Sequence, residues 1–223
     1  MNPDNVLVIG DTHEPFTHKH YLDFCIETQK EYRCGTVVHI GDLVDNHALS
    51  YHEHNPNGRS PADEMKEAEK RAKDWFDAFP KVKMCKGNHD DLVARKAMTY
   101  GIPERAIRPF EEIWDLPRGW EFEWSYQICG VKYEHGTAYS GLYPQATACK
   151  SNRQKTVIGH LHAVAGDIWT ENDKDCIWGL SVGCGIDRMK YAFWYGKDFK
   201  AKPILGCGVV LNSGKKPHFI KMF

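Results

Sequence analysis

The first 90 residues alternate between short apolar runs and segments with helical spacing. Apolar runs at 6–9, 36–40 and 81–85 predict three buried strands. Between them, apolar residues recur at helix-like spacing over 19–33 and over 60–79. Ser60 followed by Pro61 is a typical helix start, because serine caps a helix and proline suits its first turn. This order of strand, helix, strand, helix, strand predicts an α/β fold class.

The pattern shifts towards strands after residue 117. Helical pieces are expected over 91–100 and 103–114, and residues 126–129 and 131–134 flank a glycine turn that predicts a hairpin. Later strands are predicted at the following positions: 156–158, 163–170, 176–183, 204–211 and 218–222. Helix signals are sparse there, so we expect a mostly antiparallel second region. One domain over residues 1–223, with two packed sheets and flanking helices, fits this order best.

The composition is that of an ordinary globular protein, with 42% hydrophobic and 26% charged residues. No apolar run approaches the roughly 20 residues of a membrane span, and the N-terminus lacks a signal-peptide pattern. We therefore expect no membrane partner and a cytoplasmic location. The 8 cysteines form no Cys-x-x-Cys pair, which favours free buried thiols over disulfides or a cysteine zinc site.

The formal net charge of −1 conceals an asymmetry along the chain. From Lys150 onwards there are 12 basic and 6 acidic residues, which is a net charge of +6. A basic segment is a weak indication of an anionic partner such as nucleic acid. Solvated lysines on strand faces are the simpler interpretation, and the sequence does not specify an oligomeric state.

Five short polar phrases each follow an apolar run. They are Asp11-Thr-His13, Gly41-Asp42-Leu-Val-Asp45, Gly87-Asn88-His89-Asp90, His135-Gly136 and Gly159-His160-Leu-His162. Open α/β sheets bind ligands beyond the carboxyl ends of their strands, so these side chains are expected at one edge. Asp, His and Asn ligands without thiolate suit Mn, Fe, Zn or Mg ions. Six or seven ligands exceed the four of a tetrahedral zinc, whereas two ions sharing one carboxylate would use them all.

In their order, these phrases resemble the calcineurin-like metallophosphoesterase superfamily, particularly its small stand-alone or phage-encoded members. The family pattern D-x-H, G-D-x-x-D, G-N-H-D/E, H and G-H-x-H is complete from Asp11 to His162. The resemblance implies a four-layer α/β/β/α sandwich of two mixed sheets flanked by helices. It also implies two divalent metal ions, with manganese favoured, and a phosphoester substrate.

The same resemblance implies a role for each residue of the phrases. The first ion would be held by Asp11, His13 and His162, and the second by Asn88, His135 and His160, with Asp42 bridging the two. A hydroxide between the ions would be the nucleophile. His89 would protonate the leaving group, and Asp45 would orient His89.

The substrate is less well defined by these residues. Protein Ser/Thr phosphatases of the superfamily have an arginine after the second aspartate of G-D-x-V-D-R-G, and it grips the phosphate. This chain has Asn46 there, which favours a phosphodiesterase acting on nucleotide-type or small phosphodiesters. The alternatives are a phosphomonoesterase or phosphoprotein phosphatase, a DNA or RNA nuclease, and a non-catalytic interaction protein. The loop after Asp45 should border the site, and its candidate substrate contacts are Asn46, His47, His52 and His54.

Overall fold

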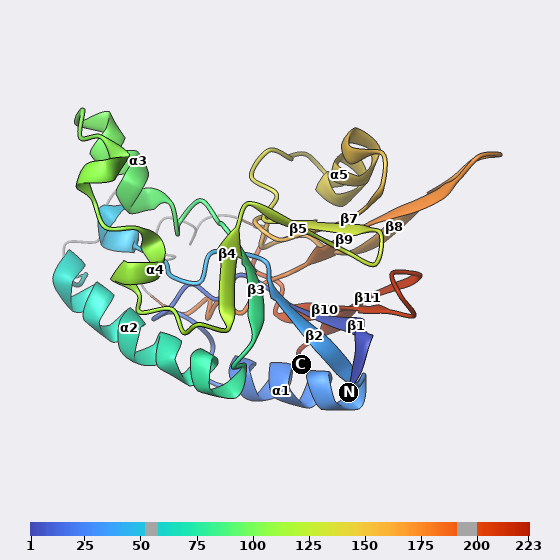
Figure 1. Cartoon of the computed structure of the whole chain (residues 1–223), viewed down its shortest axis with the longest axis horizontal. Helices are drawn as coiled ribbons and strands as arrows, with labels where there is room; N and C mark the ends of the chain where they lie inside the picture. The colour runs from blue at the N-terminus through green and yellow to red at the C-terminus, as the bar shows by residue number, and fades with distance from the viewer. Residues whose placement is uncertain (52–57, 191–199) are drawn as a thin grey trace.

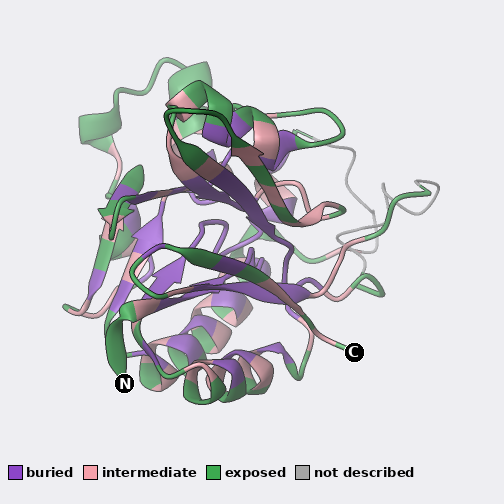
Figure 2. Ribbon diagram, turned by 90° about the vertical axis from the view of Figure 1, so that its right-hand side faces the viewer, coloured by how far each residue is buried: buried purple, intermediate pink, exposed green. Residues whose placement is uncertain are grey.

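The structure is a computed structural model that describes residues 1–51, 58–190 and 200–223. Two of the candidate substrate contacts, His52 and His54, lie outside the described residues. Two β-sheets pack face to face, and helices cover the outer face of each sheet (Figures 1 and 2). The four layers confirm the expected α/β/β/α sandwich.

The first sheet has the strand order β11-β10-β1-β2-β3-β4. Its strands are β1 (Asn2–Ile9), β2 (Cys34–His39), β3 (Val82–Cys85), β4 (Trp120–Glu123), β10 (Gly206–Leu211) and β11 (Lys216–Lys221). Strands β1 to β4 pair in parallel, and β10 and β11 add antiparallel strands beside β1. Because β1, β2 and β3 are parallel neighbours, their carboxyl ends meet at one edge.

The second sheet has the order β5-β6-β7-β9-β8. Its strands are β5 (Ser125–Ile128), β6 (Val131–Glu134), β7 (Lys155–Ile158), β8 (Ala165–Glu171) and β9 (Cys176–Val182). The predicted hairpin is β5 and β6, but β7 pairs in parallel with both β6 and β9, so this sheet is mixed. The expectation of antiparallel pairing missed helix α5 (Pro144–Asn152), which connects β6 to the parallel strand β7.

Helices α1 (Tyr21–Glu31) and α2 (Pro61–Ala78) lie against the outer face of the first sheet (Figure 1). Helix α2 begins as predicted, because the Ser60 hydroxyl accepts a hydrogen bond of 3.2 Å from the Asp63 main-chain N–H. Helix α3 (Leu92–Thr99) follows β3, and η1 (His47–Leu49) is a short turn after β2. The helix expected over 103–114 is only η2 (Glu104–Ala106) and α4 (Phe110–Ile113), since Pro109 disfavours helical backbone at the preceding residue.

Alternating side chains of the central strands divide into two cores. Leu7 and Ile9 of β1 pack in the core between the first sheet and its helices. Val6 and Val8 of the same strand pack in the core between the two sheets. Figure 2 shows that many residues in the strands of the two facing sheets are buried. Strands covered on both sides hold their carboxyl ends in fixed positions, and the polar phrases begin there.

Two further findings concern the cysteines and the helices. All 8 cysteines are free, and all are buried except Cys129 and Cys176. Within the described ranges, no helix combines the length and the apolar character needed to span a bilayer.

Candidate metal centre

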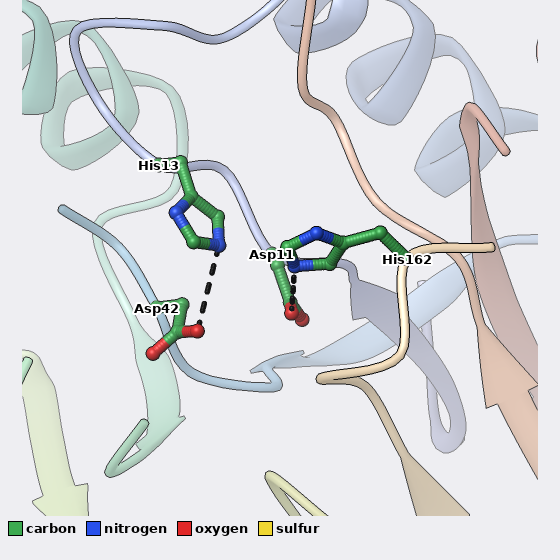
Figure 3. A group of neighbouring side chains, drawn as sticks. All are labelled: Asp11, His13, Asp42 and His162. Carbon is green, nitrogen blue, oxygen red and sulfur yellow. Dashed lines mark hydrogen bonds and ion pairs between the residues drawn. The ribbon is translucent and has the colours of Figure 1, made fainter. Parts of the chain in front are cut away.

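Side chains from several loops converge where the two sheets meet. Asp11 and His13 follow β1, Asp42 follows β2, and His162 comes from the loop after β7 (Figure 3). Their ligand atoms lie within 4.8 Å of one another. The ligand atoms of a second group, Asp42, His135 and His160, lie within the same distance of one another. Oδ1 of Asn88 lies 3.0 Å from Nε2 of His135, so the structure brings all the predicted ligands together, with Asp42 common to both groups.

The Asp42 carboxylate lies between the two groups. Its Oδ2 is 3.4 Å from Nε2 of His13 (Figure 3) and 3.2 Å from Nε2 of His135. Its Oδ1 accepts a hydrogen bond of 2.8 Å from the main-chain N–H of His89. Among the described residues, the buried Oδ2 has no hydrogen-bond partner. An oxygen in this position suits a carboxylate that bridges two cations.

The hydrogen bond on the other side of the ring determines which nitrogen of His135 faces the site. Nδ1 lies 3.1 Å from the Ile40 carbonyl oxygen, which can only accept, so Nδ1 carries a proton. Nε2 then faces oxygens of Asp42 and Asn88. Either a proton on Nε2 or a bound cation would satisfy these acceptors. Burial disfavours a charged ring, but Asp42 and Asp11 outweigh it and raise the pKa of His135 to about 9. The surroundings of His135 therefore favour positive charge.

His13, like His135, has a hydrogen-bond acceptor beside its Nδ1. Its Nδ1 lies 2.5 Å from Oδ1 of Asp45, while its Nε2 faces Asp42. Burial alone would lower the pKa of His13, but Asp42 and Asp45 raise it well above the ordinary value. A carboxylate behind the distal nitrogen of a metal-binding histidine commonly fixes its tautomer and orientation. Asp45 takes that position behind His13.

Asp11 completes the group beside the second sheet. Its Oδ2 accepts a 2.9 Å hydrogen bond from the His160 main-chain N–H and lies 3.1 Å from Nε2 of His162 (Figure 3). Burial raises the pKa of Asp11, but His135 and His162 outweigh it, so the net shift is downwards. In the described part of the chain, Oδ1 of Asp11 is buried without a hydrogen-bond partner. Orphaned carboxylate oxygens facing imidazoles fit divalent cations.

Two glycines of the polar phrases are required by close packing against these carboxylates. A Cβ on Gly87 would collide with the side chain and main-chain nitrogen of Asp42, and one on Gly159 would collide with the Asp11 carboxylate. Left-handed backbone also occurs at three predicted ligands: φ is 52° at His13, 54° at Asp42 and 66° at His160. Non-glycine residues rarely adopt this conformation, and such strain is concentrated at functional sites.

His89 lies at the border of the buried group, with its ring centroid 4.5 Å from that of His13. Its Nδ1 is 2.5 Å from the Asp45 main-chain oxygen and 3.7 Å from Oδ1 of the same residue. The sequence predicted that Asp45 orients His89. In the structure this contact is made by the Asp45 carbonyl, while the carboxylate lies closer to His13.

The two candidate substrate contacts next to Asp45 are Asn46 and His47. Both side chains are buried. The Asn46 side-chain amide donates a hydrogen bond of 3.0 Å to the His89 carbonyl oxygen. Nδ1 of His47 lies 4.0 Å from Oδ2 of Asp45. Asn46 thus supports the position of His89, and a direct contact of either residue with substrate stays a prediction.

A family comparison agrees with this geometry. The model of the family described as calcineurin-like phosphoesterase matches residues 5–194. This chain belongs to the calcineurin-like phosphoesterase family. No curated protein sequence matches it.

Solved structures that are similar to this calcineurin-like phosphoesterase are distant from it in sequence. A metallophosphoesterase from Sphaerobacter thermophilus is 13% identical, with 98% of this chain and 88% of that chain covered and a TM-score of 0.51. Vacuolar Protein Sorting 29 from Cryptosporidium parvum is 15% identical, with 96% and 88% covered and a TM-score of 0.47. The E. coli phosphoesterase YfcE is 15% identical, with 93% and 88% covered and a TM-score of 0.43. At 13% identity, the likeness to the Sphaerobacter thermophilus protein shows the fold alone.

Asp90 of this phosphoesterase holds two loops of the site together, a role that residue spacing does not predict. Its buried carboxylate accepts main-chain hydrogen bonds from Asp42 (2.8 Å), Leu43 (2.9 Å) and Gly87 (2.9 Å). Burial and the charge of Asp42 raise the pKa of Asp90 to about 7, and the N–H donors oppose that shift. Asp90 therefore fastens the loop after β2 to the loop after β3. Its place as the last residue of the Gly87-Asn-His-Asp90 phrase was the sequence feature that could have indicated this role.

His39, at the end of β2, supports the same loops from below. The Gly41 main-chain N–H donates to its Nδ1 at 3.2 Å, so its Nε2 carries the proton and donates to Oγ1 of Thr12 at 3.1 Å. The Thr12 hydroxyl in turn donates to the Leu43 carbonyl oxygen at 3.0 Å. Complete burial lowers the pKa of His39 to about 4. A neutral histidine thus connects the loop of Asp11 to the loop of Asp42.

Proposed function

We propose that this protein is a phosphodiesterase that depends on two divalent ions, with manganese favoured, and acts on nucleotide-type or small phosphodiesters. The observation that carries the proposal is the environment of Asn46. Its amide is directed inwards to the His89 carbonyl oxygen, at the position where the related protein phosphatases have a phosphate-gripping arginine. A monoester dianion needs more compensating positive charge than a diester monoanion. A site without that arginine favours the diester.

The seven predicted ligands would hold the ions, with Asp42 between them. When bound, the two ions would supply an activated water as the nucleophile and neutralise charge on the phosphate. His89 would give its Nε2 proton to the leaving alkoxide, because its Nδ1 is already engaged with the Asp45 carbonyl. The His89 side chain is 21% exposed, whereas those of His13 and His135 are almost fully buried. His89 can therefore contact a substrate from its place at the border of the site.

The competing functions differ in the features they require. A phosphomonoesterase would need another cation at the phosphate. Basic residues of the last third belong to separate elements, such as Lys155 of β7 and Lys216 of β11, and this distribution gives no specific support for a nuclease. A non-catalytic role is disfavoured because every ligand of the family pattern is present, together with His89.

The proposal is tested with two substrates after chelation and re-addition of Mn²⁺. The expected result is faster hydrolysis, in kcat/KM, of bis(4-nitrophenyl) phosphate than of 4-nitrophenyl phosphate. The Asp42→Ala variant, assayed in parallel, identifies any contaminating activity. A clear preference for the monoester would contradict the proposal, and activity that persists without any divalent ion would remove its chemical basis.

A further inference from the structure

We infer that Arg95 and Tyr51 form a subsite for the leaving group, which selects substrates whose leaving group carries its own anion, a carboxylate or a phosphate. This inference rests on the proposed function, because it takes His89 as the residue that protonates the leaving group. It adds the substrate class that the motif residues do not specify.

A cavity of about 190 Å³ lies beside His89. It is lined by Ser50, Tyr51, Asn88, His89, Leu92 and Arg95. Leu92 and Arg95 are three residues apart on α3, so they share one face of the helix. The opposite wall comes from the end of the η1 turn, which contacts α3 and lies beside it in Figure 1. Asn88 is the only predicted metal ligand among the lining residues, and it lies there beside the proposed acid His89.

This position is where a leaving group should lie. A general acid must be within hydrogen-bond reach of the oxygen that it protonates. The atoms attached to that oxygen therefore occupy space next to His89, on the side away from the buried ligands. The cavity provides that space, and the buried Leu92 side chain makes part of its lining apolar.

Arg95 supplies a cation at the far side of the cavity. Throughout the described residues, no carboxylate lies within ion-pair distance of Arg95, and its side chain makes no hydrogen bond. Its guanidinium carbon is 5.7 Å from the centroid of the Tyr51 ring. A guanidinium beside an aromatic ring, with its donors uncommitted, is suited to bidentate binding of a carboxylate or phosphate.

Tyr51 is held against the same helix. Nζ of Lys96 lies 3.9 Å from the centroid of its ring, and its hydroxyl lies 3.2 Å from Oγ1 of Thr99. The side chain is nevertheless 55% exposed. A ring anchored at one end and open to solvent can pack against an aryl or sugar group that enters the cavity.

The spacing along α3 assigns Arg95 to a second anion and not to the scissile phosphate. The Cα of Arg95 lies about 4.5 Å further along the helix axis than the Cα of Leu92, and so further from the end of α3 that follows His89. An anion bound by Arg95 should therefore be separated from the scissile oxygen by a small spacer. The charge of Arg95 also acts on Asp91, but the two side chains form no ion pair.

The test uses two substrates that differ by one carboxylate: methyl 4-nitrophenyl phosphate and methyl 3-carboxy-4-nitrophenyl phosphate. The wild-type enzyme should prefer the carboxylated leaving group in kcat/KM by about ten- to hundredfold, the range expected for hydrogen bonds to a charged group. Arg95→Gln should bring this ratio close to one, and Arg95→Lys should restore part of it. Arg118→Gln is the matched control, because Arg118 is exposed before β4, whose start lies at the opposite edge of the parallel sheet.

The outcomes separate the subsite from the proposed function. An equal loss on both substrates in Arg95→Gln would mean that Arg95 grips the scissile phosphate, and an unchanged ratio would mean that it binds nothing; either result overturns the inference. If the wild type hydrolyses neither substrate, the proposed function fails. Calorimetric binding of phenyl and 3-carboxyphenyl methylphosphonate then still decides the subsite, because the carboxylate should strengthen binding to the wild type but not to Arg95→Gln. Equal binding of both compounds to the wild type would overturn the inference.

Discussion

The site has two parts that are built in different ways. The buried floor consists of the predicted metal ligands together with Asp90 and His39, and the exposed rim consists of Tyr51 and Arg95. On the floor, Asp42 and Asp11 each contact side chains and main-chain groups from several loops, and Asp90 and His39 fasten those loops together. At the rim, Tyr51 and Arg95 are exposed and are held by a few contacts along one helix. A rigid floor suits a fixed reaction, whereas a lightly held rim can change between relatives. On the proposed function, the floor would determine the reaction and the rim would determine the substrate.

Removing the bridge should have the largest effect. We expect Asp42→Ala to abolish hydrolysis and to weaken the binding of both ions, because its carboxylate belongs to both ligand groups. Turnover and metal content after Mn²⁺ loading are the measurements. Asp23→Ala, which alters an exposed carboxylate on α1, is the control. Two ions retained by Asp42→Ala would mean that Asp42 does not bridge them.

The next largest effect is expected at His89, which lies between the floor and the rim and is the proposed general acid. His89→Ala should keep both ions but lose about 10²–10⁴-fold in kcat, the usual range for general acid–base catalysis. The loss should be smaller for aryl leaving groups, since a leaving group of low pKa needs little protonation. Rates across a series of leaving groups measure this dependence, with His20→Ala as an exposed control. A loss that is the same for every leaving group would argue against the acid role.

Asp45→Asn distinguishes support of the metal centre from support of His89. The Asp45 carboxylate lies 2.5 Å from Nδ1 of His13 but 3.7 Å from Nδ1 of His89, whose closer contact is the Asp45 carbonyl oxygen. We therefore expect metal affinity to fall by about 10–100-fold. Activity should recover in part as Mn²⁺ is raised. Metal titration of the variant is the measurement. Normal metal affinity with a His89-like defect would instead place the carboxylate at His89, as the family resemblance implied.

The smallest expected effect concerns the stability of the floor. The pKa of His39 is about 4 in the folded chain, below its ordinary value of 6.5, so between these values the unfolded chain binds a proton that the folded chain does not. Stability from this group is complete above pH 6.5 and falls as the pH drops towards 4, by about 3 kcal/mol in all.

Urea unfolding of the chelated protein at pH 7 and pH 4.5 measures this dependence. His39→Gln should be less stable than the wild type at pH 7, because it loses the connection to Thr12 and Gly41. That difference should shrink at pH 4.5, because only the wild type carries the His39 penalty. A difference that is the same at both pH values would show that His39 does not titrate in this range.

Much of the floor could be predicted from the sequence, because its chemistry is carried by short phrases placed directly after apolar strands. Parallel strands that end together bring Asp11, Asp42 and Asn88 to one edge whatever the loops between them contain. Helix α5 could not be predicted from apolar periodicity, since it packs against β7 and β9. Pro144 in its first turn was a local signal of this helix.

The supporting contacts and the rim were beyond sequence reasoning for a different reason. The partner of a buried carboxylate depends on distances between loops, so neither the contact of Asp45 with His13 nor the three N–H bonds of Asp90 follow from residue spacing. Likewise, nothing in the sequence relates Tyr51 to Arg95, because they meet only when η1 packs against α3. These are tertiary effects, and they decide the roles that the motifs leave open.

The central claim is that one carboxylate lies between two metal ions. Crystals of the Mn²⁺-loaded protein, measured at the manganese absorption edge, test it most directly. We predict two anomalous peaks about 3.5–4 Å apart, one beside Asp11, His13 and His162 and the other beside Asn88, His135 and His160, with Asp42 contacting both. A single peak, or two peaks that do not share Asp42, would contradict this account.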